Sequence, residues 1–192
     1  MMGNSTNRRV RVSAALISVF AAALLAFQST GAAFSATTEN AGNAFAAGSV
    51  TLSDNDAGTA MFNLPNMKPN DAAIGCIEVT YSGSLDPEVR TYGAITAGDG
   101  LDAYLDLTIE RGTGTCAAFV ADAAVWTNGT DGDLGVFLGA VTNYATGVDN
   151  WQPTGGGADD VVPYRFTITL QDNPLAQAKS VTVTFTWEAQ NL

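Results

Sequence analysis

The chain has 192 residues, with 19 acidic and 8 basic side chains, a formal net charge of −11 and no histidine. Such a negative charge disfavours nucleic acid and anionic membranes as partners, because binding to phosphates requires clustered lysine and arginine. Without histidine the chain has no Ser-His-Asp or Cys-His nucleophilic system and no histidine-based zinc site. No other catalytic constellation is recognisable, so we expect a protein that is not an enzyme.

The first predicted element is an export signal at residues 1–33. Three basic residues (Arg8, Arg9 and Arg11) precede an apolar run over residues 12–27, which is shorter than the ~20 residues of a membrane-spanning helix. Small residues before Phe34 place signal-peptidase cleavage between Ala33 and Phe34, with an uncleaved N-terminal anchor as the alternative. We therefore expect a secreted protein that contacts the membrane only before cleavage, with residues 34–192 as one acidic domain.

After the leader, apolar and polar residues alternate in short runs, the pattern of half-buried β-strands. The clearest runs are residues 77–81, 101–110, 164–171 and 181–188. Weaker candidates are residues 47–53, 60–64, 89–95, 116–126 and 136–141, and residues 117–124 could instead form one or two helical turns. Clusters of glycine, asparagine and aspartate separate these runs. The pattern predicts an all-β fold, a two-sheet antiparallel β-sandwich with minor helical turns in its loops.

Cys76 and Cys116 are the two cysteines of the chain, and an exported protein meets oxidising conditions. A disulfide between them is the default prediction. Cys76 alternates with the polar residues of its strand and should lie on the less buried face. Cys116 begins the next candidate strand after a glycine-rich turn. The bridge should therefore join a loop end to a neighbouring strand outside the central core.

Calcium is the metal that the sequence allows. Asp54 with Asp56, and Asp131 with Asp133, place carboxylates two residues apart around turns, a spacing that hard cations use. Aspartate beside glycine is also ordinary turn chemistry, so we expect no metal site and no cofactor, with calcium as the alternative.

The three tryptophans are the other ligand-binding candidates. Trp187 falls on the apolar side of its strand and should belong to the core. Trp126 and Trp151 lie near turn-rich loops, and Trp151 is the one to test for stacking on a ligand if the protein is instead a glycan-binding module.

Three segments resemble the TasA/camelysin family of exported bacterial proteins. The first is the junction at residues 33–49, where Ala-Phe-Ser is followed by Gly-Asn-Ala-Phe-Ala-Ala-Gly-Ser. The second is Asn-Leu-Pro-Asn-Met-Lys-Pro-Asn-Asp at residues 63–71, followed by a strand and the turn at residues 82–85. Asn70 stands where the family has glycine, and both residues tolerate the left-handed conformation of a turn that Pro69 begins. The third is the last strand, residues 180–189.

The resemblance implies a jelly-roll-like subunit of extracellular biofilm-matrix fibres or of a cell-surface layer, released by a dedicated signal peptidase. Its partners would be copies of itself or sister matrix subunits. Residues 34–49, with Phe34 and Phe45, follow no turn that would fix them in a hairpin. They could add to an open sheet edge of the next subunit, or simply complete their own sandwich. The alternatives are a monomeric glycan- or cell-wall-binding module and a camelysin-like surface metalloprotease.

Overall fold

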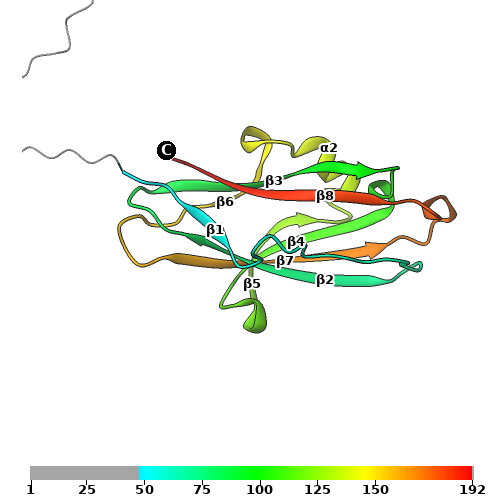
Figure 1. Ribbon diagram of the computed structural model, residues 1–192, viewed down its shortest axis with the longest axis horizontal. Coiled ribbons are helices and arrows are strands. Elements are labelled where there is room, and N and C mark those ends of the chain that lie inside the picture. The colour runs from blue at the N-terminus through cyan, green and yellow to red at the C-terminus, as the bar shows by residue number, and fades with distance from the viewer. Residues whose placement is uncertain (1–47, 192) are drawn as a thin grey trace, which may run out of the picture. The chain divides into compact units, whose positions relative to one another are not determined.

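The computed structural model describes residues 48–191 (Figure 1). The predicted leader, the cleavage site between Ala33 and Phe34, and Phe45 lie outside these residues. The strands of the described part are β1 (Leu52–Asp54), β2 (Ala72–Tyr81), β3 (Pro87–Gly98), β4 (Leu105–Thr113), β5 (Val120–Thr127), β6 (Val148–Trp151), β7 (Asp160–Leu170) and β8 (Val181–Asn191). Its helices are α2 (Leu134–Ala140) and the 3-10 turns η2 (Asp102–Tyr104), η3 (Cys116–Ala118), η4 (Tyr144–Thr146) and η5 (Pro174–Ala176). Within this part no helix has the length and apolar character needed to cross a membrane.

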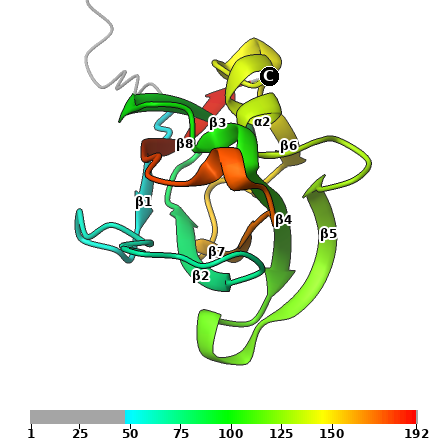
Figure 2. The ribbon, with the colours of Figure 1, turned by 90° about the vertical axis from the view of Figure 1, so that its right-hand side faces the viewer.

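The strands form two antiparallel sheets that face each other (Figures 1 and 2). The larger sheet has the order β1-β2-β7-β4-β5, and the smaller has the order β6-β3-β8. The predicted all-β, two-sheet sandwich is therefore confirmed. The order β2-β7-β4-β5 opposite β6-β3-β8 is that of a jelly roll, in which the first strand would pair with the last. Here β1 instead pairs with β2, where Leu52 lies opposite Tyr81.

The core lies between the sheets and follows the alternation of the strand sequences. Along β7, Tyr164, Phe166 and every second residue after them are buried. Phe185 of β8 packs on Phe166 with ring centroids 4.7 Å apart, and Trp187 packs on Tyr164 at 5.3 Å. Trp187 therefore lies on the core side of its strand, as predicted.

Residues 60–64 form no strand, contrary to the prediction. Met61 and Phe62 instead pack against the core beside Gly75. A Cβ added at Gly75 would lie 2.5 Å from the Met61 Cγ, so a larger residue at position 75 would clash with this loop. The apolar residues of this loop are thus explained by burial rather than by strand pairing.

Residues 136–141 belong mainly to helix α2, so the strand predicted there is wrong. Leu134, Phe137 and Leu138 are the buried residues of α2, and this spacing places them on one helical face. Asp133 caps the helix, since its Oδ1 accepts a hydrogen bond from the backbone N–H of Val136 at 2.9 Å. The cap and the spacing together favour a helix. The segment is too short for its hydrophobic residues to distinguish a helical period from the alternation of a strand.

Three predicted strands begin elsewhere in the structure, and one strand was missed. The run at residues 101–110 begins as η2, and β4 starts at Leu105. The run at residues 116–126 begins as η3, and only its later part forms β5. In the first candidate strand, residues 47–53, only Leu52 and Ser53 belong to β1. Strand β6 was not predicted, because its four residues are too few to show alternation.

The turn before β2 agrees with expectation: Asn70 has φ 66°, and the Asp71 N–H donates to the Lys68 carbonyl at 2.9 Å.

The Cys76–Cys116 disulfide is present, with the two Cα atoms 5.6 Å apart. Cys76 lies on the outer face of the larger sheet, and Cys116 lies in η3 at the tip of the β4–β5 hairpin. The Cys116 N–H also donates to Glu78 Oε1 at 2.7 Å. The hairpin tip is therefore held over β2 from outside the core, as predicted.

Replacing both cysteines with serine should leave a folded protein with a melting temperature lowered by several degrees. The buried core does not depend on the bridge, and removing a disulfide from a domain of this size costs about 2–4 kcal/mol. Calorimetry of oxidised wild type and the double variant measures the difference. Loss of the cooperative transition in the variant would contradict a bridge peripheral to the core.

Candidate functional site

The two sheets have four edge strands, and three of them are poor templates for pairing with another chain. Strand β1 has three residues and β6 has four. Strand β5 is longer, but its register with β4 shifts twice, which leaves Asp122 and Val125 as extra residues on the edge strand. Short strands, bulges and edge charges are features that prevent edge-to-edge association.

Strand β8 is the exception among these edges. It has 11 residues and, among the strands of residues 48–191, pairs only with β3. Its one register shift places the extra residue, Thr96, on β3 rather than on β8. The strand contains no proline or lysine and alternates valine, threonine and aromatic residues. A long, regular edge of this composition presents unpaired backbone N–H and C=O groups to any strand that approaches it.

The core-facing side of β8 is incompletely covered. Phe185 and Trp187 are only half-buried, whereas Tyr164 and Phe166 beneath them are fully buried. A groove of about 200 Å³ opens here between β1 and β8, at the side of the sandwich where β1 stands in Figure 2. It is lined by Leu52, Ser53, Asp54, Val79, Phe185, Thr186 and Trp187. The open backbone edge and the half-buried aromatic side chains thus lie on the same strand.

The Trp187 indole is an unusual polar group on the core-facing side of β8. Within residues 48–191, its Nε1 is the one buried side-chain nitrogen or oxygen atom without a hydrogen-bond partner. By contrast, the Trp126 indole N–H donates to the Gly132 carbonyl at 2.9 Å. Sequence reasoning placed Trp187 in the core but missed the groove, because the sequence does not show which strand lacks a neighbour.

The four aspartates considered as calcium ligands each accept a backbone hydrogen bond in a turn or at a helix start. Asp54 Oδ1 accepts from the Asp56 N–H at 3.3 Å, and Asp56 Oδ1 accepts from the Gly58 N–H at 2.6 Å. Asp131 Oδ2 accepts from the Thr127 N–H at 2.8 Å, and Asp133 caps α2. In the described part of the chain, no three Asp, Glu, Cys or His residues form a group that could hold a metal ion.

Asp54 is the titratable residue of the groove lining. Partial burial raises the pKa of its carboxyl, and the adjacent Asp56 carboxyl raises it further through a side-chain hydrogen bond. Any chain that fills the groove would bury this carboxyl more deeply, which disfavours its charged form.

The burial of Trp126 and Trp151 does not support the ligand-stacking role considered for them. Trp126 and Trp151 are both buried, and neither presents its ring to solvent. Trp126 packs edge-to-face on Phe137 with centroids 5.1 Å apart. Trp151 pairs with Val89 of β3 through the backbone of β6, and its side chain faces the core. The glycine and proline residues around Trp151 indicated a loop, but the short strand β6 turns the ring inward.

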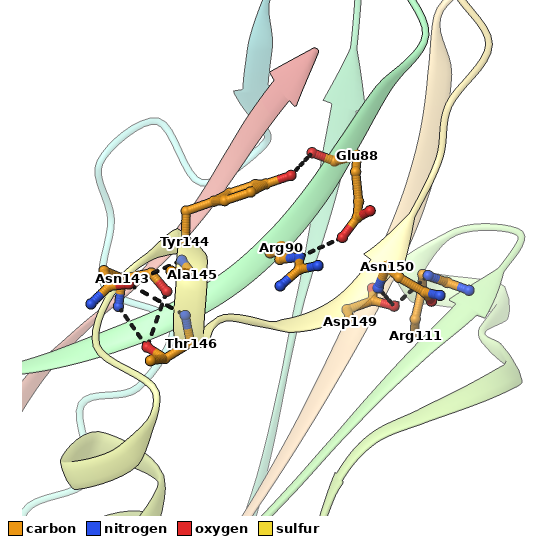
Figure 3. Close-up of polar contacts among 9 residues, drawn as sticks. All are labelled: Glu88, Arg90, Arg111, Asn143, Tyr144, Ala145, Thr146, Asp149 and Asn150. Atoms are coloured by element: carbon orange, nitrogen blue, oxygen red, sulfur yellow. Dashed lines mark hydrogen bonds and ion pairs between the residues drawn. The ribbon is translucent and has the colours of Figure 1, made fainter. Parts of the chain in front are cut away.

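A polar network connects the two sheets near β6 (Figure 3). Asp149 of β6 binds Arg111 of β4, with Nη1 and Oδ1 2.5 Å apart, and its Oδ2 accepts a hydrogen bond from the Tyr164 hydroxyl at 2.7 Å. Because Arg111 and Tyr164 belong to the larger sheet and Asp149 to the smaller, the network stabilises the packing of one sheet on the other.

A second group of contacts holds η4 on the outer face of the smaller sheet (Figure 3). The Tyr144 hydroxyl donates to the Glu88 carbonyl at 3.2 Å, and the Arg90 guanidinium lies 5.2 Å from the centre of the Tyr144 ring. Arg90 also pairs with the Glu88 carboxylate. These groups satisfy one another, so we assign the cluster a structural role.

Alkaline pH should destabilise the protein through Tyr164. Burial, and then the negative charge of Asp149, raise the pKa of its hydroxyl above the ordinary value. The stabilisation is complete below about pH 10, where unfolded tyrosine is also neutral, and is lost as pH rises further, by up to about 1.4 kcal/mol per pH unit. Urea unfolding between about pH 8 and pH 11 measures this slope. Tyr164→Phe should flatten it; an unchanged slope in that variant would assign the alkaline loss to other groups.

Comparison with models of known protein families found no match to this chain, and a search of curated proteins found no significant match either.

Proposed function

We propose that this protein is a secreted structural subunit of extracellular fibres or a surface layer, and that β8 accepts residues 34–47 of a neighbouring copy. One observation carries the proposal: the last strand of the jelly roll lacks the partner that a first strand would supply, because β1 pairs with β2 instead. The position beside β8 is therefore open in residues 48–191, and the part of the chain that precedes β1 is the candidate to fill it.

The dimensions agree with this assignment. An extended chain rises about 3.3 Å per residue, so residues 34–47 reach roughly 45 Å, compared with roughly 36 Å for β8. In β-strand addition, backbone hydrogen bonds provide affinity and side-chain pockets set the register. Phe34 and Phe45 supply aromatic side chains for the groove beside Phe185 and Trp187.

Donation from one copy to the next is a head-to-tail contact, which generates an open filament unless the rotation between copies closes a ring. While the leader is attached, the segment would be held at the membrane, so cleavage after Ala33 would permit assembly. The excess of acidic residues makes copies repel one another at low ionic strength. Moderate salt should therefore favour assembly.

Removing residues 34–42, so that the chain begins at Asn43, should abolish filaments and leave the sandwich folded. The chain beginning at Phe34 is the control, and negative-stain electron microscopy with light scattering provides the measurement. An excess of synthetic peptide with the sequence of residues 34–47 should also stop the control chain from assembling, whereas a scrambled peptide should not. Filaments of unchanged length and number from the Asn43 chain would overturn the proposed mechanism.

A further inference from the structure

The chain that leads into β1 is fixed at one end of the sandwich. The Ser49 carbonyl accepts a hydrogen bond from the Ser84 N–H at 3.0 Å, in the turn between β2 and β3. Strand β3 begins just after this turn, and its first residue, Pro87, lies opposite Asn191 at the end of β8. Strand β8 begins at the opposite end of the sandwich, where it follows η5. The described chain therefore starts at the end where β8 finishes, remote from η5 (Figure 1).

This attachment limits how residues 34–47 can lie beside β8. Every strand pair within residues 48–191 is antiparallel, and antiparallel pairing is slightly more stable per residue than parallel pairing. A segment paired antiparallel along β8 has residue 47 at the beginning of β8, next to η5. In the same subunit that position is one strand length, roughly 36 Å, from Ser49, whereas two residues span at most about 7 Å. The antiparallel position along β8 is therefore open only to the segment of another copy.

We infer that the inserted strand runs antiparallel to β8, so that the donating copy stands at the η5 end of the accepting copy. This inference rests on the proposed function and adds the direction of the strand and the surface where two copies meet. Residues 34–47 exceed the 11 residues of β8 by three, and three residues span roughly 10 Å. So short a connection brings the β2–β3 turn of the donating copy against η5 of the accepting copy.

Leu175 of η5 is the residue that we place in this contact. Its side chain is 65 % exposed. The turn that carries it is well fixed, because Asn173 Oδ1 accepts a hydrogen bond from the Leu175 N–H at 3.0 Å and Ala176 is buried. A leucine presented by an ordered turn can bury apolar area against a neighbour with little loss of backbone freedom.

The direction of the strand also decides the kind of assembly. With an antiparallel strand, a copy accepts at its η5 end and donates from the opposite end, so it can do both at once and the chain of copies stays open. A parallel strand would place both events at one end, where two copies could exchange segments in a closed dimer.

Cross-linking within filaments reports the direction. Two double variants of the chain beginning at Phe34 carry Ala46→Cys, one with Thr182→Cys and the other with Gln190→Cys. Thr182 and Gln190 are both exposed and lie near opposite ends of β8, and the native cysteines are joined in a disulfide. A short bis-maleimide should convert the Thr182 variant into covalent multimers on a denaturing gel and leave the Gln190 variant monomeric. Multimers from the Gln190 variant would indicate a parallel strand and overturn the inference.

The contact is tested by Leu175→Asp in the chain beginning at Phe34. The substitution should raise the subunit concentration at which filaments form roughly tenfold, the effect of losing one buried leucine, with an unchanged melting temperature. Val120→Asp is the matched control: Val120 is 63 % exposed, but it lies on the β4–β5 hairpin, whose tip the disulfide holds over the middle of β2. This control should keep the filament threshold of wild type. Equal thresholds for the two variants would overturn the contact at η5.

These outcomes are distinct from failure of the proposed function. Filaments from the chain that begins at Asn43 would refute strand donation itself. The synthetic peptide of residues 34–47 carries no second subunit, so Leu175→Asp should bind it as tightly as wild type does. Weaker peptide binding would assign the effect to the groove and overturn the contact. If the Asn43 chain does not assemble but Leu175→Asp assembles normally, strand donation stands and the contact at η5 is refuted.

Discussion

Asp149→Ala should lower the free energy of unfolding by about 3–5 kcal/mol, the cost of leaving one member of a buried ion pair alone. The Asp149 side chain is 4 % exposed and Arg111 is 16 % exposed. The substitution also removes the acceptor of the Tyr164 hydroxyl. Since a domain of this size is stable by roughly 5–15 kcal/mol, this one change removes a large share of the total.

The same arginine provides a matched control. Asp122 also approaches Arg111, with the Nη2 and Oδ2 atoms 3.9 Å apart, but its side chain is 57 % exposed. Exposed ion pairs contribute at most about 1 kcal/mol, so Asp122→Ala should unfold close to wild type in urea. Equal losses for the two alanine variants would mean that burial does not set the strength of the Asp149 pair.

Phe137→Ala should cost about 3–5 kcal/mol, because it empties the space between α2 and the smaller sheet. Phe137 is fully buried; its ring lies 5.1 Å from Trp126 and 6.0 Å from Phe185. Loss of this ring also removes support from the inner face of β8. Chemical denaturation followed by tryptophan fluorescence measures the change.

The neighbouring residue of the same helix tests whether the effect comes from the core. Val136 is 48 % exposed, so Val136→Ala should change stability by no more than about 0.5 kcal/mol. If the two variants were equally destabilised, the loss would reflect helix propensity in α2 rather than packing of Phe137.

The assembly proposal links these stability effects to function. Within residues 48–191, β8 has no strand on its outer edge and its aromatic side chains are half-buried, so other contacts must hold the sandwich together. The Arg111–Asp149–Tyr164 network and the packing of α2 on β3 and β8 provide such contacts. A subunit weakened there should lose assembly only as it unfolds, whereas the chain beginning at Asn43 should lose assembly while folded.

The sequence by itself determined the class of fold and the strongest strands. Alternation over residues 164–171 and 181–188 is long enough to identify both strands and their buried faces, and β7 and β8 are found there. The disulfide followed because two cysteines allow a single intramolecular pairing. These features are local or combinatorial, so they require no knowledge of which elements are neighbours in space.

Only the tertiary structure decided which residues form the candidate site. Trp151 and Trp187 both occur in strands with one apolar side, but Trp151 is enclosed by the sandwich whereas Trp187 faces a groove. Met61 and Phe62 have the composition of a strand, yet they fill a space beside Gly75. An edge is the absence of a neighbouring strand, and that absence depends on β1 pairing with β2 rather than with β8. The alternation within β8 is the same with or without a partner, because side-chain period reflects the strand itself and not what lies beside it.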